Sequence, residues 1–97
     1  MPKKTPVKNN AAAKVTFEVR EEASAVYVAG DFNGWSTSAT PLAKRKDGRF
    51  STTITLPKGK EYRYRYVVDG DRWTNDADAD RYEPNDHGSD DCIIDLR

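Results

Sequence analysis

The chain has 97 residues, of which 33% are charged, 36% are hydrophobic and 10% are aromatic. This length is enough for one domain and excludes the (β/α)₈ barrel of about 250 residues that many enzymes use, while the aromatic content argues against disorder. The formal net charge is +0, but residues 1–14 carry four lysines and no acid, whereas residues 69–97 carry ten acids against three arginines. The uniformly basic surface of a nucleic-acid-binding protein is therefore excluded.

The first half of the chain predicts a tail, two strands and a loop. Residues 1–14 show no apolar periodicity and contain two prolines and two asparagines, so we expect a flexible basic tail before a domain over residues 15–97. Alternation of apolar and polar residues over residues 15–20 predicts a half-buried strand. Residues 25–29 predict a second short strand, and the Asp-Phe-Asn-Gly-Trp sequence at residues 31–35 predicts a loop around an Asn-Gly turn.

The second half contains the clearest strand of the chain. Tyr62, Tyr64 and Tyr66 alternate with outward-facing residues over residues 61–68, so the tyrosines are expected to face the core. Residues 74–90 are polar and are expected to form an irregular, solvated acidic loop. Further strands are predicted at residues 49–56, 71–73 and 92–96. Together these patterns predict an all-β fold, a β-sandwich of about six to eight short antiparallel strands.

Catalytic and metal-binding arrangements have little basis in the sequence. The single histidine, His87, lies in a polar loop, and Cys92 stands beside isoleucines in a predicted strand, where cysteine usually packs as a small hydrophobe. Asp76, Asp78 and Asp80 have the spacing that opens an EF-hand loop. However, the glycine and the final glutamate that this loop needs are replaced by arginine and histidine. We therefore predict no enzyme activity, no cofactor and no metal.

Two tryptophans stand in polar, turn-rich segments instead of apolar ones. Trp35 follows an Asn-Gly pair, and Trp73 follows an Asp-Arg pair. A flat indole can cover the apolar face of a glucose ring while a charged side chain, such as Arg65 on the outward face of its strand, binds the hydroxyl rim. The alternative is that both indoles cover the ends of a thin hydrophobic core and that Arg65 is a solvated strand residue.

The compartment can be inferred from three absences. One cysteine cannot form an internal disulfide, which fits a reducing environment. No apolar run approaches the roughly 18 residues of a membrane span, and the basic N-terminus is not followed by an apolar signal core. We therefore expect a cytoplasmic protein with neither a membrane nor a nucleic acid as its partner.

Three segments together resemble the family 48 carbohydrate-binding module, also described as the isoamylase N-terminal-like early-set domain. They are residues 26–35 (Val-Tyr-Val-Ala-Gly-Asp-Phe-Asn-Gly-Trp), residues 64–70 (Tyr-Arg-Tyr-Val-Val-Asp-Gly) with Trp73, and residues 92–96 (Cys-Ile-Ile-Asp-Leu). The family occurs in glycogen-branching and debranching enzymes and in the β subunit of AMP-activated protein kinase, where it binds glycogen. Similar stand-alone bacterial proteins are often named as glycoside hydrolases. The resemblance implies an immunoglobulin-like sandwich.

The same resemblance implies a non-catalytic module that binds an α-glucan such as glycogen, starch or a maltooligosaccharide. Arg65 takes the place of the family's lysine, which keeps the charge but changes the geometry. The family's asparagine before the last strand falls on Asp91, which accepts but cannot donate, and its apolar finger falls near His87. The carbohydrate-binding residues expected from the resemblance are Trp35, Arg65, Trp73, Asn33, Asp91 and His87. The alternative is a protein-interaction or regulatory module that kept the fold and lost or weakened sugar binding.

Overall fold

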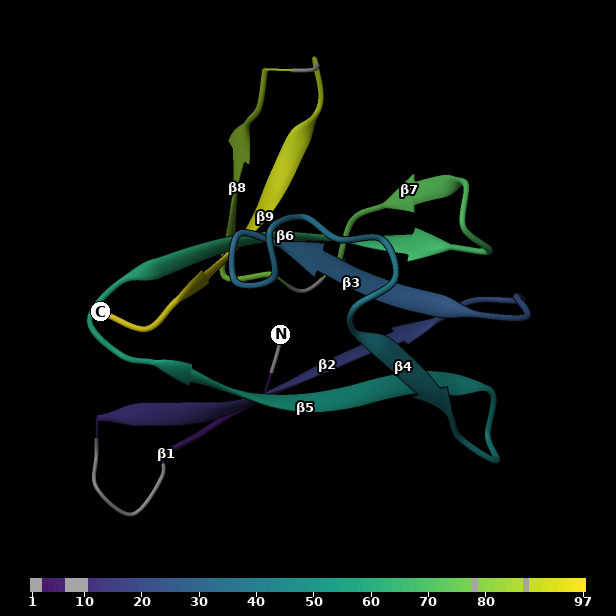
Figure 1. Ribbon diagram of the computed structural model, residues 1–97, viewed down its shortest axis with the longest axis horizontal. Helices are drawn as coiled ribbons and strands as arrows, with labels where there is room; N and C mark the ends of the chain where they lie inside the picture. Colours follow the sequence, from purple (N-terminus) through teal and green to yellow (C-terminus); the bar gives the residue numbers. More distant parts are fainter. Residues whose placement is uncertain (1–2, 7–10, 78, 87) are drawn as a thin grey trace.

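Nine antiparallel strands make up the fold in the computed structural model, which describes residues 3–6, 11–77, 79–86 and 88–97 (Figure 1). Within these described ranges no helix is long and apolar enough to cross a membrane. The predicted all-β fold class is confirmed. The strands are β1 (Lys3–Pro6), β2 (Ala12–Arg20), β3 (Val26–Gly30), β4 (Pro41–Lys44), β5 (Arg49–Pro57), β6 (Glu61–Val68), β7 (Arg72–Thr74), β8 (Arg81–Pro84) and β9 (Asp90–Asp95).

The strands form two layers that face each other as a sandwich. The first layer has the order β1, β2, β5, and the second has the order β3, β6, β9, β8, with β7 paired to β6. The short strand β4 hydrogen-bonds to both β5 and β3, so it joins the layers at one edge. Figure 1 shows β2 and β5 below β3 and β6, with the β8–β9 hairpin extending beyond the second layer.

Inward-facing aromatic side chains fill the space between the layers. Phe17 of β2 and Tyr64 of β6 are fully buried, and their ring centroids lie 5.0 Å apart at an interplanar angle of 68°. Tyr66 extends the row, with its ring centroid 5.9 Å from that of Tyr64. Such edge-to-face pairs add about 0.5–1.5 kcal/mol each to the stabilisation that burial provides. The tyrosine alternation predicted for β6 is therefore confirmed, with every second residue of this strand inside the core.

Residues 1–14, which were expected to form a flexible tail, include two strand segments. β1 pairs antiparallel with β2, and β2 itself already begins at Ala12. Lys4 reaches the second layer, where its Nζ forms an ion pair with Asp80 and donates a hydrogen bond to the carbonyl oxygen of Asp95 (3.1 Å). Sequence patterns did not indicate this strand because its pairing uses backbone groups and one long charged side chain, with no apolar alternation.

The acidic segment at residues 74–90, expected to be an irregular solvated loop, is only partly so. It contains β8, and the side chain of Asp76 is buried. The Asp76 Oδ2 accepts hydrogen bonds from the hydroxyls of Tyr64 (2.9 Å) and Tyr66 (3.1 Å). The solvated-loop prediction is wrong at Asp76 because two tyrosine donors compensate the cost of burying its carboxyl group.

The backbone of Asp76 makes further contacts. Its backbone N–H donates to the Sγ of Cys92 (3.2 Å), and its carbonyl oxygen accepts from the hydroxyl of Tyr82. Cys92 is buried, as predicted for a small hydrophobe. Burial raises the pKa of the Cys92 thiol to about 11, and it also raises the pKa values of the Tyr64 and Tyr66 hydroxyls. These three groups therefore stay protonated at neutral pH and can act as donors.

Removing one donor from Asp76 is expected to destabilise the fold. Tyr64→Phe should lower the free energy of unfolding by about 1.5–3 kcal/mol because the buried carboxyl group loses a strong hydrogen bond. Urea unfolding measures this loss. Tyr27→Phe, on the outward face of β3, is the matched control and should change the same quantity by less than about 0.5 kcal/mol. Equal losses in the two variants would contradict a special role for the Asp76 contact.

Alkaline pH is expected to destabilise the fold through the same cluster. Because the folded-state pKa of Cys92 is raised from 9.0 to about 11, its contribution to stability is fully present below pH 9.0 and is lost as the pH rises toward 11. The raised pKa values of Tyr64 and Tyr66 act in the same direction at higher pH. Urea midpoints should therefore fall above about pH 9. Cys92→Ala should show a shallower fall between pH 9.0 and 11, and an unchanged slope would refute the assignment to this thiol.

Candidate functional site

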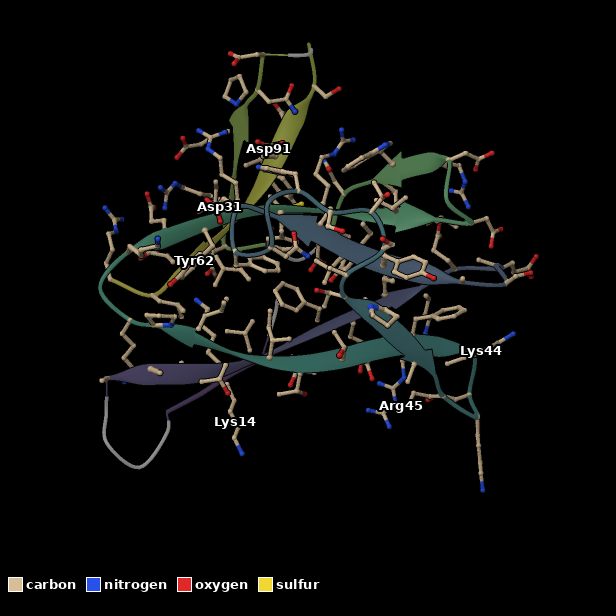
Figure 2. All side chains as sticks on the ribbon, viewed as in Figure 1. Lys14, Asp31, Lys44, Arg45, Tyr62 and Asp91 are labelled. Atoms are coloured by element: carbon tan, nitrogen blue, oxygen red, sulfur yellow. The ribbon has the colours of Figure 1, made fainter. Side chains whose placement is uncertain are left out.

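The outer face of the second layer carries a cleft of about 810 Å³. Its walls come from the β3–β4 loop, the outward face of β6, strand β7 and the β8–β9 hairpin. Figure 2 labels Asp91 on β9, near the point where this hairpin leaves the sandwich. The volume lies in the upper part of the range of about 300–1,000 Å³ that is typical of ligand sites. The lining residues are Trp35, Arg63, Arg65, Trp73, Pro84, Asn85, Asp86 and Asp91.

Trp35 reaches the cleft from a tight turn in the β3–β4 loop. Its backbone lies in the left-handed region, with a φ of 59°, directly after Gly34 with a φ of 69°. A residue other than glycine held in this region costs about 1–3 kcal/mol, so surrounding contacts have to stabilise it. The Trp35 N–H donates to the carbonyl oxygen of Gly30 (2.8 Å), which closes the turn. The strained conformation thus coincides with the residue whose indole lines the cleft.

Asn33 holds the two ends of this loop together. Its Oδ1 accepts from the N–H of Gly30 (3.0 Å), and its Nδ2 donates to the carbonyl oxygen of Val28 (3.0 Å) and to the Oγ1 of Thr40 (3.0 Å). Gly30 itself passes close to β6, because a Cβ at this position would lie 2.5 Å from the carbonyl oxygen of Arg63. The amide of Asn33 is therefore used within the loop.

Arg65 and Trp73 form a second feature of the cleft. The guanidinium carbon of Arg65, on β6, lies 5.8 Å from the centre of the Trp73 ring, on β7. This cation–π contact is worth about 0.5–1 kcal/mol at an exposed site. The Arg65 Nε also donates to the Oδ1 of Asn75 (2.7 Å), and the Nδ2 of Asn75 donates to the carbonyl oxygen of Asp90 (2.9 Å). Asn75 thereby connects the end of β7 to β9 and fixes the guanidinium beside the indole.

Val67, which faces Trp73 across the β6–β7 pair, is buried on the outward side of β6. Its alternation with the tyrosines places Val67 on the outward face of β6, yet it is fully buried. Val67 lies opposite Trp73 in the β6–β7 register, and cross-strand neighbours share one face of a sheet. Trp73 itself remains 40% exposed. Trp73 therefore stands opposite a buried apolar residue while much of its own surface stays exposed.

Asp91 connects the β8–β9 hairpin to β6. It is 5% exposed, and its Oδ2 accepts from the Nη1 of Arg63 (3.2 Å). Its Oδ1 accepts from the Nδ2 of Asn85 at the tip side of the hairpin (2.9 Å). Both carboxylate oxygens thus bind side chains that themselves line the cleft.

The structure brings four of the six expected site residues into one cleft: Trp35, Arg65, Trp73 and Asp91. Asn33 lies in the loop that carries Trp35 and is not among the lining residues. His87 lies outside the described residues.

Four lining residues were missed by the sequence analysis. Arg63 carried a usable signal, since it stands two residues before Arg65 and so shares its face of β6. Pro84, Asn85 and Asp86 carried no such signal. They reach the cleft because Arg81–Pro84 pairs with β9 in a hairpin, and no periodic pattern in the sequence marks this pairing.

The arrangement offers aromatic faces and hydrogen-bonding groups. Two indoles present π surfaces, two guanidinium groups carry donors and the carboxylate of Asp86 carries acceptors, whereas both oxygens of Asp91 are engaged by Arg63 and Asn85. In the described part of the chain, no group of three or more His, Cys, Asp or Glu residues is placed to hold a metal ion. The cleft is therefore suited to a neutral, hydroxyl-rich ligand with flat apolar faces.

Residues 13–97 match the sequence profile of a family described as the glycogen recognition site of AMP-activated protein kinase. The chain belongs to this family of carbohydrate-binding modules. It is similar to the β-2 subunits of 5'-AMP-activated protein kinase from Mus musculus, Rattus norvegicus and Homo sapiens, each 37% identical over 51 residues. The matched segment covers 53% of this chain and 17% of each relative, so it corresponds to a small part of those proteins.

Membership of the family confirms the resemblance read from the sequence. Carbohydrate-binding modules are non-catalytic domains, so this glycogen-recognition module is a binding domain and not an enzyme. The matched range includes all the lining residues of the cleft.

The loop of the glycogen-recognition module is expected to depend on Asn33. Asn33→Ala removes three hydrogen bonds and should lower the free energy of unfolding by about 1–3 kcal/mol. Urea unfolding measures the change. Ser38→Ala, at an exposed position of the same loop, is the matched control and should be close to neutral. A neutral Asn33→Ala would show that the strained Trp35 turn is held by other contacts.

Proposed function

We propose that the cleft binds an α-glucan chain, such as the outer chain of glycogen, with Trp35 and Trp73 stacking on glucose rings and Arg65 donating hydrogen bonds to their hydroxyls. The observation that carries the proposal is the convergence of two tryptophans from separate loops and strands on one cleft, with a guanidinium beside one of them. The family of the chain is described by its recognition of glycogen, which supports this ligand class.

Stacking on the indoles supplies the apolar part of the binding free energy. Each platform can remove about 50–60 Å² of apolar surface from water, which is worth roughly 1–1.5 kcal/mol. Ordering a flexible oligosaccharide opposes this gain, so the net dissociation constant is expected in the micromolar to millimolar range. Such affinity suits a module that returns repeatedly to a polymer with many equivalent sites.

Arg65 supplies polar recognition. Its contacts with Asn75 and Trp73 fix the guanidinium before a ligand arrives, so less rotamer entropy is lost on binding. A guanidinium presents donors in a planar fork, which fits two neighbouring hydroxyls better than a single ammonium does. Asn33 contributes indirectly in this scheme, by holding the turn that carries Trp35.

Intrinsic fluorescence during a titration with maltoheptaose tests the proposal. The chain contains two tryptophans, and both line the cleft, so the indole signal reports directly on it. A saturable change is expected for the wild-type protein and none for glucose. Trp35→Ala and Trp73→Ala should each weaken binding by about tenfold or more, which corresponds to about 1.4 kcal/mol.

Tyr27→Ala provides the matched control, because Tyr27 is a half-buried aromatic residue on the outward face of β3 that does not line the cleft. Its affinity for maltoheptaose should stay within about twofold of wild type. Circular dichroism and urea midpoints establish that each variant is folded. A flat titration of the folded wild-type protein up to millimolar sugar would refute the proposal and favour a protein-interaction module on the same fold.

A further inference from the structure

A second arginine of the cleft, Arg63, is held as firmly as Arg65. Its Nη1 lies 3.2 Å from the Oδ2 of Asp91 and 3.4 Å from the carbonyl oxygen of Pro84, and its Nη2 lies 3.0 Å from the Oε1 of Glu83. Its backbone N–H donates to the Oδ2 of Asp31 (3.2 Å), so the β3–β4 loop also fixes its position. Three contacts from β8 and β9 thus orient the side chain, which lines the cleft, and a fourth contact fixes its backbone.

Asp91 is a buried residue that binds the guanidinium of Arg63. Its two oxygens are bound by Arg63 and by Asn85, and its side chain is 8% exposed. A carboxylate with both oxygens engaged and little exposed surface is better placed to orient its partners than to contact a sugar. The charge of Asp91 is needed for this purpose, because a charge-assisted hydrogen bond is roughly twice as strong as a neutral one.

The two arginines lie beside different walls of the cleft. Residues two apart on a strand lie about 6.6 Å apart along it and point to the same face. Arg65 stands beside the Trp73 indole, whereas Arg63 stands beside the β8–β9 hairpin. One glucose unit cannot use both guanidinium groups as closely as two units of an extended chain can.

We propose that Arg63 is a second sugar-contacting residue, that Asp91 is the positioning residue that holds it, and that the two arginines contact different glucose units of one chain. This inference rests on the proposed function. It makes the cleft selective for longer maltooligosaccharides, because a short one can engage only one arginine at a time. It also assigns residue 91 a role in orienting the site in place of a direct contact with sugar.

Affinities for maltotriose and maltoheptaose, measured by indole fluorescence, test the proposal. Arg63→Gln keeps a donor for Asp91 but removes the guanidinium. It should weaken maltoheptaose binding by about tenfold and reduce the preference for maltoheptaose over maltotriose toward unity. Arg65→Gln is the matched variant on the same face and should weaken the binding of both sugars. If the substitutions only loosened the fold, the ratio of the maltoheptaose and maltotriose affinities would not change in Arg63→Gln while staying the same in Arg65→Gln.

Asp91→Asn and the double variant separate positioning from direct contact. Asp91→Asn should weaken maltoheptaose binding because Arg63 loses its charged partner, and Arg63→Gln/Asp91→Asn should bind no more weakly than Arg63→Gln alone. Additive losses, or an Asp91→Asn variant that binds as tightly as wild type or more tightly, would overturn the role of Asp91. If Asp91→Asn does not fold, Arg63→Gln still decides whether Arg63 contacts the sugar.

These measurements also distinguish a failure of this inference from a failure of the proposed function. If the wild-type protein does not bind maltoheptaose, the proposed function fails. If it binds and Arg63→Gln leaves both affinities unchanged, the proposed function stands and only the role of Arg63 is refuted.

Discussion

The carboxyl group of Asp76 lies in the interior of the sandwich, where it accepts from the hydroxyls of Tyr64 and Tyr66, and this contact helps to attach the acidic segment of residues 74–90 to the core. The neighbouring residue, Asn75, holds both Arg65 and the start of β9. The buried contact of Asp76 therefore lies directly beside the contacts that position Arg65 and the start of β9. Because a buried carboxyl group without donors is costly, this segment has one well-defined position and not several.

Much of the fold could be predicted from the sequence because the strands of a sandwich alternate apolar and polar residues. The alternation in β2 and β6 follows from one face being buried and one solvated, and the tyrosines of β6 lie where this rule places them. Strands β1, β4 and β8 were not predicted, since each has four residues and depends on a partner strand for its existence. The burial of Asp76 was equally unpredictable, because it is set by donors that come from a different strand.

The site was accessible only in part, for a related reason. Trp35, Arg65 and Trp73 could be named because they stand in recognisable local sequences, but their convergence on one cleft is a property of the fold. Asn33 belongs to the same local sequence and was expected at the sugar, whereas its amide holds the loop. Asp91 and Arg63 show the converse case: each stands at a position with a sequence signal, but the contact between them joins distant parts of the chain and could not be read from either one.

The two outermost strands of the layers, β1 and β8, are each four residues long and each ends in proline. A sheet edge normally exposes unpaired backbone groups onto which another polypeptide can add a strand, but proline has no N–H to offer, and short edges provide few pairing positions. These two edges therefore give neighbouring copies of the domain few positions at which their sheets could join. Short edge strands that end in proline thus lower the tendency of neighbouring copies of the domain to aggregate by strand addition.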